Sequence, residues 1–234
     1  MCFRQIIGAI VVDAVTGGAL NDGEGTTAGE GAKGISVTTS ATESSDPDDP
    51  LAAVLNTGTI NTTGTNADGI EVNGASVIVF NEEAITTSGD DREGINVTGS
   101  EAEVFNDAEQ GINTLGDGSR GIAVNGDQSQ ISNDGQITTS GAAAHGIFAS
   151  GAGNVIVNEG LITTNGVSAS GIFSEGVDAV IHSAGPHAPH VDLVPDAEFE
   201  RVNIAATHQL YEWAQEAGVS RFVYTSPPAL YGDA

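Results

Sequence analysis

The chain has 234 residues, with 32 Asp and Glu against 6 Lys and Arg, which gives a formal net charge of −26 at pH 7. So few basic residues exclude a basic face for nucleic acid, and the negative charge disfavours binding to anionic lipid. The single cysteine, Cys2, excludes a disulfide framework and a cysteine-based zinc site. No apolar run approaches the ~20 residues of a membrane-spanning helix, so we expect no membrane insertion.

Two compositions divide the chain near residue 176. Residues 1–176 hold 29 of the 32 glycines and neither Tyr nor Trp, whereas all three tyrosines and Trp213 come later. The charge divides too: 24 acidic and 4 basic residues before the division give −20, and 8 acidic and 2 basic residues after it give −6. The sequence therefore predicts two domains, 1–176 and 177–234.

A repeat of about 25 residues fills most of the first domain. Gly-Ile pairs recur at intervals of 25, 27, 25 and 25 residues, beginning at Gly69, Gly94, Gly121, Gly146 and Gly171. Each unit carries three short segments with aliphatic or Thr residues at alternate positions, which favours strands. Three short strands per unit, stacked in register, predict a mainly β protein: a parallel β-helix of about six to seven turns.

Inside this solenoid we expect columns of like residues, with Ile, Thr and Val stacked on their counterparts in the next turn. A recurrent asparagine is expected to form a ladder of side-chain amides at one corner, where this residue also tolerates left-handed backbone. The ladder residues are Asn56, Asn81, Asn106, Asn133 and Asn158. The glycine columns are expected to mark corners with positive φ.

The first turns fit the repeat more weakly. Ile10 and Val12 are expected to begin a frayed first turn, and Asn21 begins a second in which Gly25 replaces the usual Ile. From Asn21 to Asn56 is one period plus ten residues. The surplus predicts an acidic surface loop around residues 46–50, which have the sequence Asp-Pro-Asp-Asp-Pro.

The repeat text, such as Asn-Glu-Gly-Leu-Ile-Thr-Thr-Asn-Gly at 158–166, resembles the passenger repeats of bacterial autotransporters and related surface β-helix proteins. The resemblance covers about residues 20–176. It implies a stalk or adhesive surface, displayed outside the cell. Residues 1–12 hold one basic residue and a short apolar run, so no signal peptide is predicted.

The second domain is expected to begin with a buried strand at 176–185, followed by a helix at 196–217 and a strand at 221–226. Strand, helix and strand in this order predict a βαβ unit. Aligning the repeats places Ile181 in the register of Ile156. We therefore expect residues 177–183 to complete a last turn of the solenoid and the helix to cap its open end.

The segments Val-Asp-Ala-Val-Ile-His-Ser-Ala-Gly (177–185), Asn203 within Phe-x-Arg-Val-Asn, and Arg-Phe-Val-Tyr-Thr-Ser (221–226) resemble the extended short-chain dehydrogenases, the NAD-dependent epimerase/dehydratase family. The resemblance implies a partial Rossmann fold and an NAD(P) cofactor. It also implies that cofactor-binding residues correspond to Ser183, Ala184, Gly185, Asn203, Thr225 and Ser226.

Three parts of that family's machinery are absent. In that family the glycine-rich turn that holds the pyrophosphate at a helix N-terminus belongs to the first βα unit, and no segment of this sequence matches it. The only lysine is Lys33, and residue 29 is glycine, so there is no Tyr-x-x-x-Lys pair. Pro227 stands where the family has Ser or Thr. We therefore expect no catalysis and no bound cofactor in this chain.

Other polar groups are weaker candidates. His182, His187 and His190 could bind a metal, and the turn carboxylates of Asp90, Asp91, Asp117 and Asp127 could bind Ca²⁺, although we expect no metal. Acidic residues at corresponding corners could form the paired carboxylates of a polysaccharide-cleaving enzyme. Those residues are Glu82, Glu83, Asp107, Glu109 and Asp134, and a solvated acidic face is the expectation for them.

Three functions remain open from the sequence. The first is a structural or adhesive β-helix module with an incomplete dehydrogenase-like tail; the others are an epimerase/dehydratase remnant and a polysaccharide-active β-helix. Carbohydrate or other surface contacts and end-to-end self-association stay open as interactions, because solenoid ends expose strand edges. Localisation is undecided: the repeats imply the cell surface, and the tail implies the cytoplasm.

Overall fold

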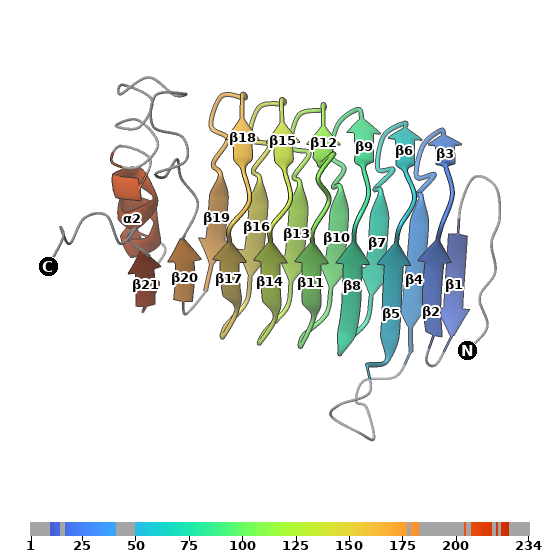
Figure 1. Cartoon of the computed structure of the whole chain (residues 1–234), viewed down its shortest axis with the longest axis horizontal. Helices are drawn as coiled ribbons and strands as arrows, with labels where there is room; N and C mark the ends of the chain where they lie inside the picture. The colour runs from blue at the N-terminus through green and yellow to red at the C-terminus, as the bar shows by residue number, and fades with distance from the viewer. Residues whose placement is uncertain are drawn as a thin grey trace, which may run out of the picture.

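The computed structural model describes residues 10–14, 17–40, 50–176, 179–182, 204, 207–216, 219 and 221–224. Over these residues the chain winds into a solenoid with three sheets that run along its long axis (Figure 1). All strand pairs within the sheets are parallel, and each strand pairs with its counterpart in the adjacent turn. The prediction of a mainly β, parallel β-helix with about 25 residues per turn is confirmed.

Each turn contributes one strand to each sheet. Sheet A contains β1 (Ile10–Ala14), β4 (Ile35–Thr39), β7 (Ile70–Asn73), β10 (Ile95–Thr98), β13 (Ile122–Asn125), β16 (Ile147–Ser150) and β19 (Ile172–Glu175). Sheet B contains β2 (Gly17–Asn21), β5 (Ala52–Asn56), β8 (Val77–Asn81), β11 (Glu103–Asn106), β14 (Gln130–Asn133), β17 (Val155–Asn158), β20 (Ala179–His182) and β21 (Arg221–Tyr224). Sheet C contains β3 (Gly25–Ala28), β6 (Ile60–Thr63), β9 (Ile85–Ser88), β12 (Ile112–Thr114), β15 (Ile137–Thr139) and β18 (Ile162–Thr164).

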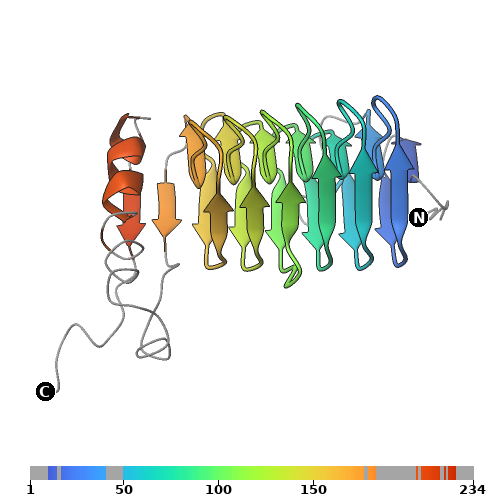
Figure 2. The ribbon, with the colours of Figure 1, turned by 90° about the horizontal axis from the view of Figure 1, so that it is seen from above.

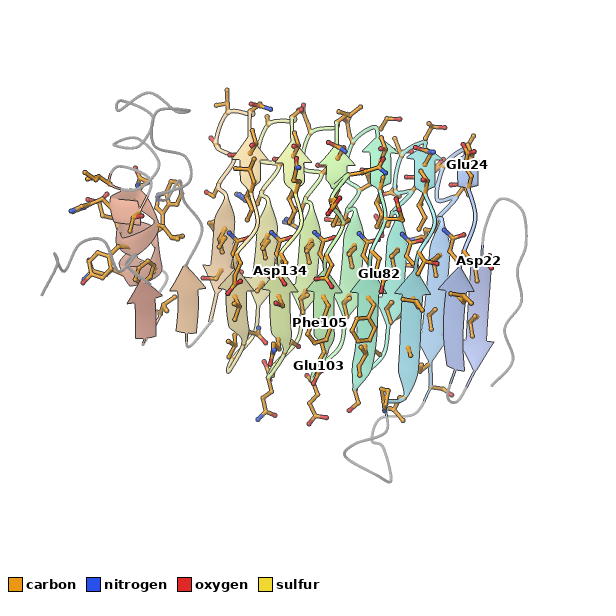
Figure 3. All side chains as sticks on the ribbon, in the orientation of Figure 1. Asp22, Glu24, Glu82, Glu103, Phe105 and Asp134 are labelled. Atoms are coloured by element: carbon orange, nitrogen blue, oxygen red, sulfur yellow. The ribbon has the colours of Figure 1, made fainter. Side chains whose placement is uncertain are left out.

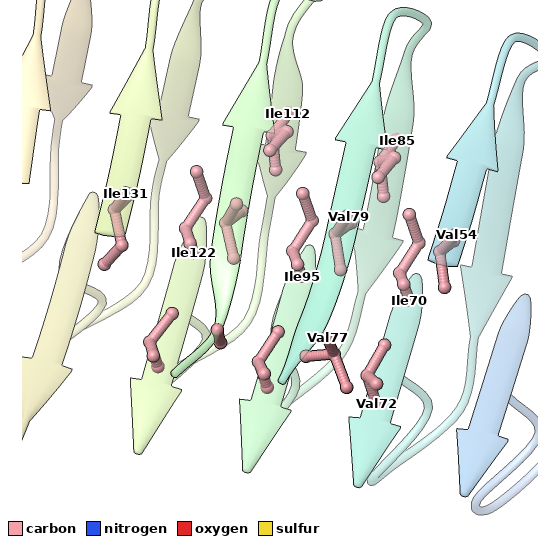
Figure 4. Close-up of a cluster of buried hydrophobic side chains, with 14 of the residues drawn as sticks. Val54, Ile70, Val72, Val77, Val79, Ile85, Ile95, Ile112, Ile122 and Ile131 are labelled. Atoms are coloured by element: carbon pink, nitrogen blue, oxygen red, sulfur yellow. The ribbon is translucent and has the colours of Figure 1, made fainter. Parts of the chain in front are cut away.

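The core is a set of aliphatic columns (Figure 4). Ile70, Ile95 and Ile122 pair with one another across β7, β10 and β13, and all three are fully buried. Alternate residues of a strand face opposite sides, so the Ile-x-Val spacing sends both side chains inward. Each such side chain stabilises the fold by about 1.5–3 kcal/mol through burial.

The first turn is formed as expected. Ile10 pairs with Ile35 and Val12 with Val37, and Gly25 lies opposite Ile60 in sheet C. The predicted acidic loop falls largely on residues 41–49, which lie outside the described residues.

A ladder of buried asparagine amides follows one corner of the solenoid. Nδ2 of each asparagine donates to Oδ1 of the next at 2.7–2.8 Å, in the order Asn21, Asn56, Asn81, Asn106, Asn133, Asn158. These residues end the strands of sheet B, and none of them has the left-handed backbone that the sequence analysis allowed. The amides therefore join successive turns by side-chain bonds inside the protein.

Glycine is required in the Gly-Ile pairs for a reason other than the positive φ that we expected. Positive φ occurs at other glycines, such as Gly64, but not at Gly94. A Cβ on Gly94 would overlap Ile112 Cγ2 and lie 2.7 Å from the carbonyl oxygen of Gly121. Close packing between sheet A and sheet C, and not backbone conformation, requires glycine in this column.

The C-terminal part extends sheet B. β20 pairs with β17, and β21 pairs with β20 in parallel after helix α2 (Thr207–Glu216), so the βαβ unit is confirmed. The predicted register was wrong by one residue, because Val180 and not Ile181 lies opposite Ile156. Three residues join β19 to β20, where four join β16 to β17, and the shorter turn moves the register.

Helix α2 lies at this end of the solenoid (Figure 2). Leu210 is buried in the same hydrophobic cluster as the solenoid core, with Phe222 packed against it. The helix thus covers the end of the core, as the sequence predicted. The described helix is shorter than the expected 196–217, since residues 183–203 lie outside the described part. None of the described helices is long and apolar enough to cross a membrane.

Candidate functional site

One candidate site is a column of polar side chains along sheet A. The residue before each Gly-Ile pair contributes one side chain per turn, and we call this the corner column. It consists of Lys33, Asp68, Glu93, Arg120, His145 and Ser170. The corner column lies just before the strands of sheet A, where Asp68 is buried and the other five residues are half-buried.

Four of the five neighbouring pairs in the corner column are in contact from one turn to the next. Lys33 Nζ lies 3.6 Å from Asp68 Oδ2, and the Glu93 amide donates to Asp68 Oδ1 at 3.1 Å. Arg120 Nη1 lies 3.3 Å from Glu93 Oε1. At the far end, the Ser170 amide donates to His145 Nδ1 at 3.1 Å. The column is therefore a chain of engaged polar groups.

A second set of contacts runs diagonally to the outward residues of the next turn. Lys33 forms an ion pair with Glu71, and Asn96 Nδ2 donates to Asp68 Oδ2 at 3.0 Å. In later turns the side chains at these diagonal positions stack on one another as planar groups. The Arg120 guanidinium lies 4.0 Å from the Phe148 ring centroid, and His145 stacks on Phe173 at 4.7 Å.

The carboxyl of Glu93, next to Asp68 in the corner column, has a strongly shifted pKa. Burial first, and then the negative charge of Asp68, raise the pKa of Glu93 to about 7, and Arg120 offsets part of this shift. Burial, with the charge of Arg120, lowers the pKa of His145. The pair can therefore hold a proton near neutral pH, which is the requirement for acid–base chemistry.

Arg92 directly precedes Glu93 in the sequence, but its side chain bonds to a backbone carbonyl and not to this carboxyl pair. Its side chain is fully buried, and Nη2 donates to the Asp90 carbonyl at 3.1 Å, while Nε and Nη1 have no partner. Burial lowers the pKa of Arg92, and nearby carboxylates, chiefly Asp90, offset part of this effect. Equivalent turns carry a small residue at this position, such as Ala67 or Ser119.

The outer face of sheet B is a second candidate (Figure 3). Its outward column carries Leu55, Phe80 and Phe105, and the two rings stack with centroids 5.0 Å apart and planes 12° apart. An acidic residue follows the ladder asparagine in four successive turns. These acids are Glu82, Asp107, Asp134 and Glu159, and all four are exposed. Apolar and acidic columns thus run side by side.

The residues that the dehydrogenase resemblance implied cannot be placed. Ser183, Ala184, Gly185, Asn203, Thr225 and Ser226 lie outside the described residues, as do His187 and His190. By backbone register, His182 in β20 lies opposite Asn158.

Three of the four turn carboxylates that could have bound Ca²⁺ accept a hydrogen bond from the backbone of the next turn. Asp90 Oδ1 accepts from the Asp117 amide at 3.0 Å, and Asp117 Oδ1 accepts from the Ala142 amide at 2.8 Å. Asp127 does the same for Ala152. Within the described part of the chain, no group of three or more His, Cys, Asp or Glu is placed to hold a metal ion.

The carboxyl pair was not among the acids that the sequence singled out. Those acids follow the asparagine ladder, whereas the acid with a raised pKa is Glu93, whose neighbour in the corner column is Asp68. A usable signal was present, because both residues directly precede Gly-Ile in successive repeats. The corner column as a whole went unrecognised because its residue types differ from turn to turn.

Comparison with known proteins gives one match. The model of the NAD dependent epimerase/dehydratase family matches residues 137–234, a segment that starts in β15 of the solenoid and includes β20, α2 and β21. No curated protein and no solved structure matches this chain. The family match covers less than half of the chain and overlaps the last repeats. The division at residue 176 and the autotransporter resemblance stay predictions.

Proposed function

We propose that this chain is a non-catalytic structural or adhesive β-helix module, similar in use to autotransporter passengers, that carries an incomplete dehydrogenase-like tail. The observation that carries the proposal is the unbroken asparagine ladder from Asn21 to Asn158. With the aliphatic columns it fills the interior with like-on-like contacts. Such a solenoid is a rigid support for its outer faces.

The contacts of the corner column support the same function. Its charged groups bind one another: Lys33 contacts Asp68, and Arg120 contacts Glu93. The outer face of sheet B instead presents exposed Phe80 beside carboxylates. A surface of that kind is suited to contact with a partner.

The test uses the full chain immobilised on beads and assayed for both binding and turnover. We expect saturable retention of surface proteins or glycans, and no turnover of nucleotide sugars with NAD or of acidic polysaccharides. Turnover of either substrate that a single substitution in the chain abolishes would show that the chain is an enzyme and would overturn the proposal.

The alternative is an NAD(P)-dependent epimerase/dehydratase remnant acting on nucleotide sugars or similar substrates. The family match to residues 137–234 and the parallel pair β20–β21 favour it. The test is NAD titration by calorimetry. Micromolar affinity that Asn203→Ala removes would replace our proposal, and an absence of heat supports it.

A polysaccharide-active enzyme is the third function. The carboxyl pair Asp68–Glu93, with the pKa of Glu93 near 7, favours it. Depolymerisation of an acidic polysaccharide, lost in Glu93→Gln and kept in the exposed-site control Glu103→Gln, would establish this function. We expect no depolymerisation, because both carboxyls are already engaged by Lys33 and Arg120.

A further inference from the structure

The outer face of sheet B carries an apolar stripe, which we define as the exposed Leu55 and Phe80 and the half-buried Phe105. Phe80 is 39% exposed and Leu55 is 36% exposed, although both are large apolar side chains in the middle of a sheet. Backbone pairing places the three in one column, on β5, β8 and β11. Neighbouring strands lie about 4.8 Å apart, so the stripe follows the solenoid axis.

The ring geometry indicates what the stripe can contact. Phe80 and Phe105 stack with centroids 5.0 Å apart, close to the strand spacing, so one face of each ring covers the other. The stacked rings and the Leu55 side chain together form an apolar surface, and such a surface packs well against aliphatic side chains.

The acids beside the stripe, which we call the acidic rail, are Glu82, Asp107, Asp134 and Glu159. They are exposed and lie one per turn, about 4.8 Å apart along the axis. None of the four has an ion-pair partner among the side chains that the structure describes. The Lys and Arg side chains that the structure describes are used elsewhere, since Lys33 and Arg120 pair within the corner column and Arg92 is buried.

From this juxtaposition we propose that the outer face of sheet B binds a cationic amphipathic segment of a partner protein. Its apolar side chains pack on the stripe, and its Lys or Arg side chains pair with the acidic rail. The inference rests on the proposed adhesive function and names the partner class for it. A helix suits the site, because its side chains at i and i+4 lie about 5–6 Å apart, close to the spacing of the rail.

Charge disfavours the other occupants of such a face. A second copy of this chain brings 32 acidic and only 6 basic residues, and so cannot neutralise the rail. An anionic polysaccharide is repelled by the same carboxylates. A neutral apolar partner would leave four charges at the rim of the interface without partners.

The test uses the full chain and a fluorescein-labelled helical peptide of Leu and Lys with one apolar face. Anisotropy is measured at low and high salt. Two further peptides replace Lys by Glu or Leu by Ser. We expect saturable binding of the Leu/Lys peptide, weakened at least tenfold by either replacement and by high salt.

Matched variants locate the binding on the protein. Phe80→Ser should weaken binding at least tenfold, and the equally exposed Phe173→Ser, on sheet A, should leave it unchanged. The double variant Glu82→Gln/Asp107→Asn should weaken binding at least tenfold and flatten the salt dependence. Glu30→Gln/Asp91→Asn removes the same charge from exposed turns after sheet C and should change affinity less than twofold.

Equal binding by all variants would show a diffuse charge effect and overturn the proposal, and so would equal binding of the Ser/Lys peptide. Self-association in sedimentation, or retention of heparin, that Phe80→Ser removes would assign the face to another occupant. If Phe80→Ser fails to fold, the charge variants still decide the result. Catalytic turnover would overturn the proposed function, whereas loss of peptide binding alone overturns only this inference.

Discussion

Thr87 and Arg92 stand where the neighbouring turns form an interior hydrogen bond, and in this turn Thr87 Oγ1 has no partner. One turn earlier Thr62 Oγ1 donates to the Ala67 carbonyl at 2.6 Å, and one turn later Thr114 Oγ1 donates to the Ser119 carbonyl at 2.7 Å. Arg92 is the one member of this column with a long charged side chain, and two of its nitrogens are also without a partner. The solenoid therefore has a local conflict at this position.

Replacing Arg92 should stabilise the protein. Arg92→Ala removes buried donors without partners and restores the small residue that Ala67 represents. We expect the free energy of unfolding to rise by about 1–3 kcal/mol, measured by urea denaturation. Arg120→Ala is the control: it loses the contacts to Glu93 and Phe148, so stability should fall or stay level. A less stable Arg92→Ala variant would contradict this reasoning.

Stability should depend on pH through Glu93. The pKa of Glu93 is about 7 in the folded chain, against 4.5 for an ordinary glutamate carboxyl, so the folded state holds this proton more tightly. The free energy of unfolding therefore falls as pH rises from about 4.5 to about 7, then levels off. At about 1.4 kcal/mol per pKa unit, the fall is on the order of 3 kcal/mol.

In the variant Glu93→Gln, the free energy of unfolding should no longer fall between about pH 4.5 and about pH 7. At pH 8 this variant should be more stable than the parent chain. Chemical denaturation at a series of pH values measures both effects. Glu103→Gln, at an exposed position on sheet B, should keep the pH dependence of the parent chain. A fall of equal size in Glu93→Gln would assign the effect to another group.

The asparagine ladder should be most sensitive in its middle. Asn106→Ala leaves Asn81 Nδ2 and Asn133 Oδ1 without their partners, whereas Asn21→Ala removes one bond at the end. Because a buried polar atom without a partner costs about 1–3 kcal/mol, we expect about 2–4 kcal/mol from Asn106→Ala and less than half of that from Asn21→Ala. Equal losses in thermal unfolding would show that the amide chain does not act as a ladder.

Glycine in the Gly-Ile pairs should be required within the solenoid and dispensable at its end. A Cβ on Gly94 would overlap Ile112 and approach the Gly121 carbonyl, whereas a Cβ on Gly171 would meet, among the described residues, only Ile162 Cγ2, at 3.8 Å. Gly94→Ala should therefore lower the free energy of unfolding by about 1–3 kcal/mol through overpacking. Gly171→Ala should leave it nearly unchanged. If urea denaturation gave similar losses of unfolding free energy for the two variants, backbone conformation and not packing would be the reason for glycine.

The repeat by itself determined the architecture. The 25-residue spacing of Gly-Ile and Asn fixes which residues stack, and alternation of Ile and Val within each strand decides which side faces the core. The same spacing identified the ladder residues from Asn56 to Asn158. These properties repeat along the chain, so they could be predicted without knowing any contact.

The tertiary structure alone decided the features that do not repeat. The outward residues vary from turn to turn, so only packing of successive turns shows that Asp68 meets Glu93 and that Phe80 stacks on Phe105. It also places Val180, and not Ile181, opposite Ile156, because the turn before β20 is one residue shorter. A period in the sequence specifies which positions stack on one another. The contacts between unlike neighbours, and the close approach between sheets that requires glycine, depend on distances between turns, which the period does not give.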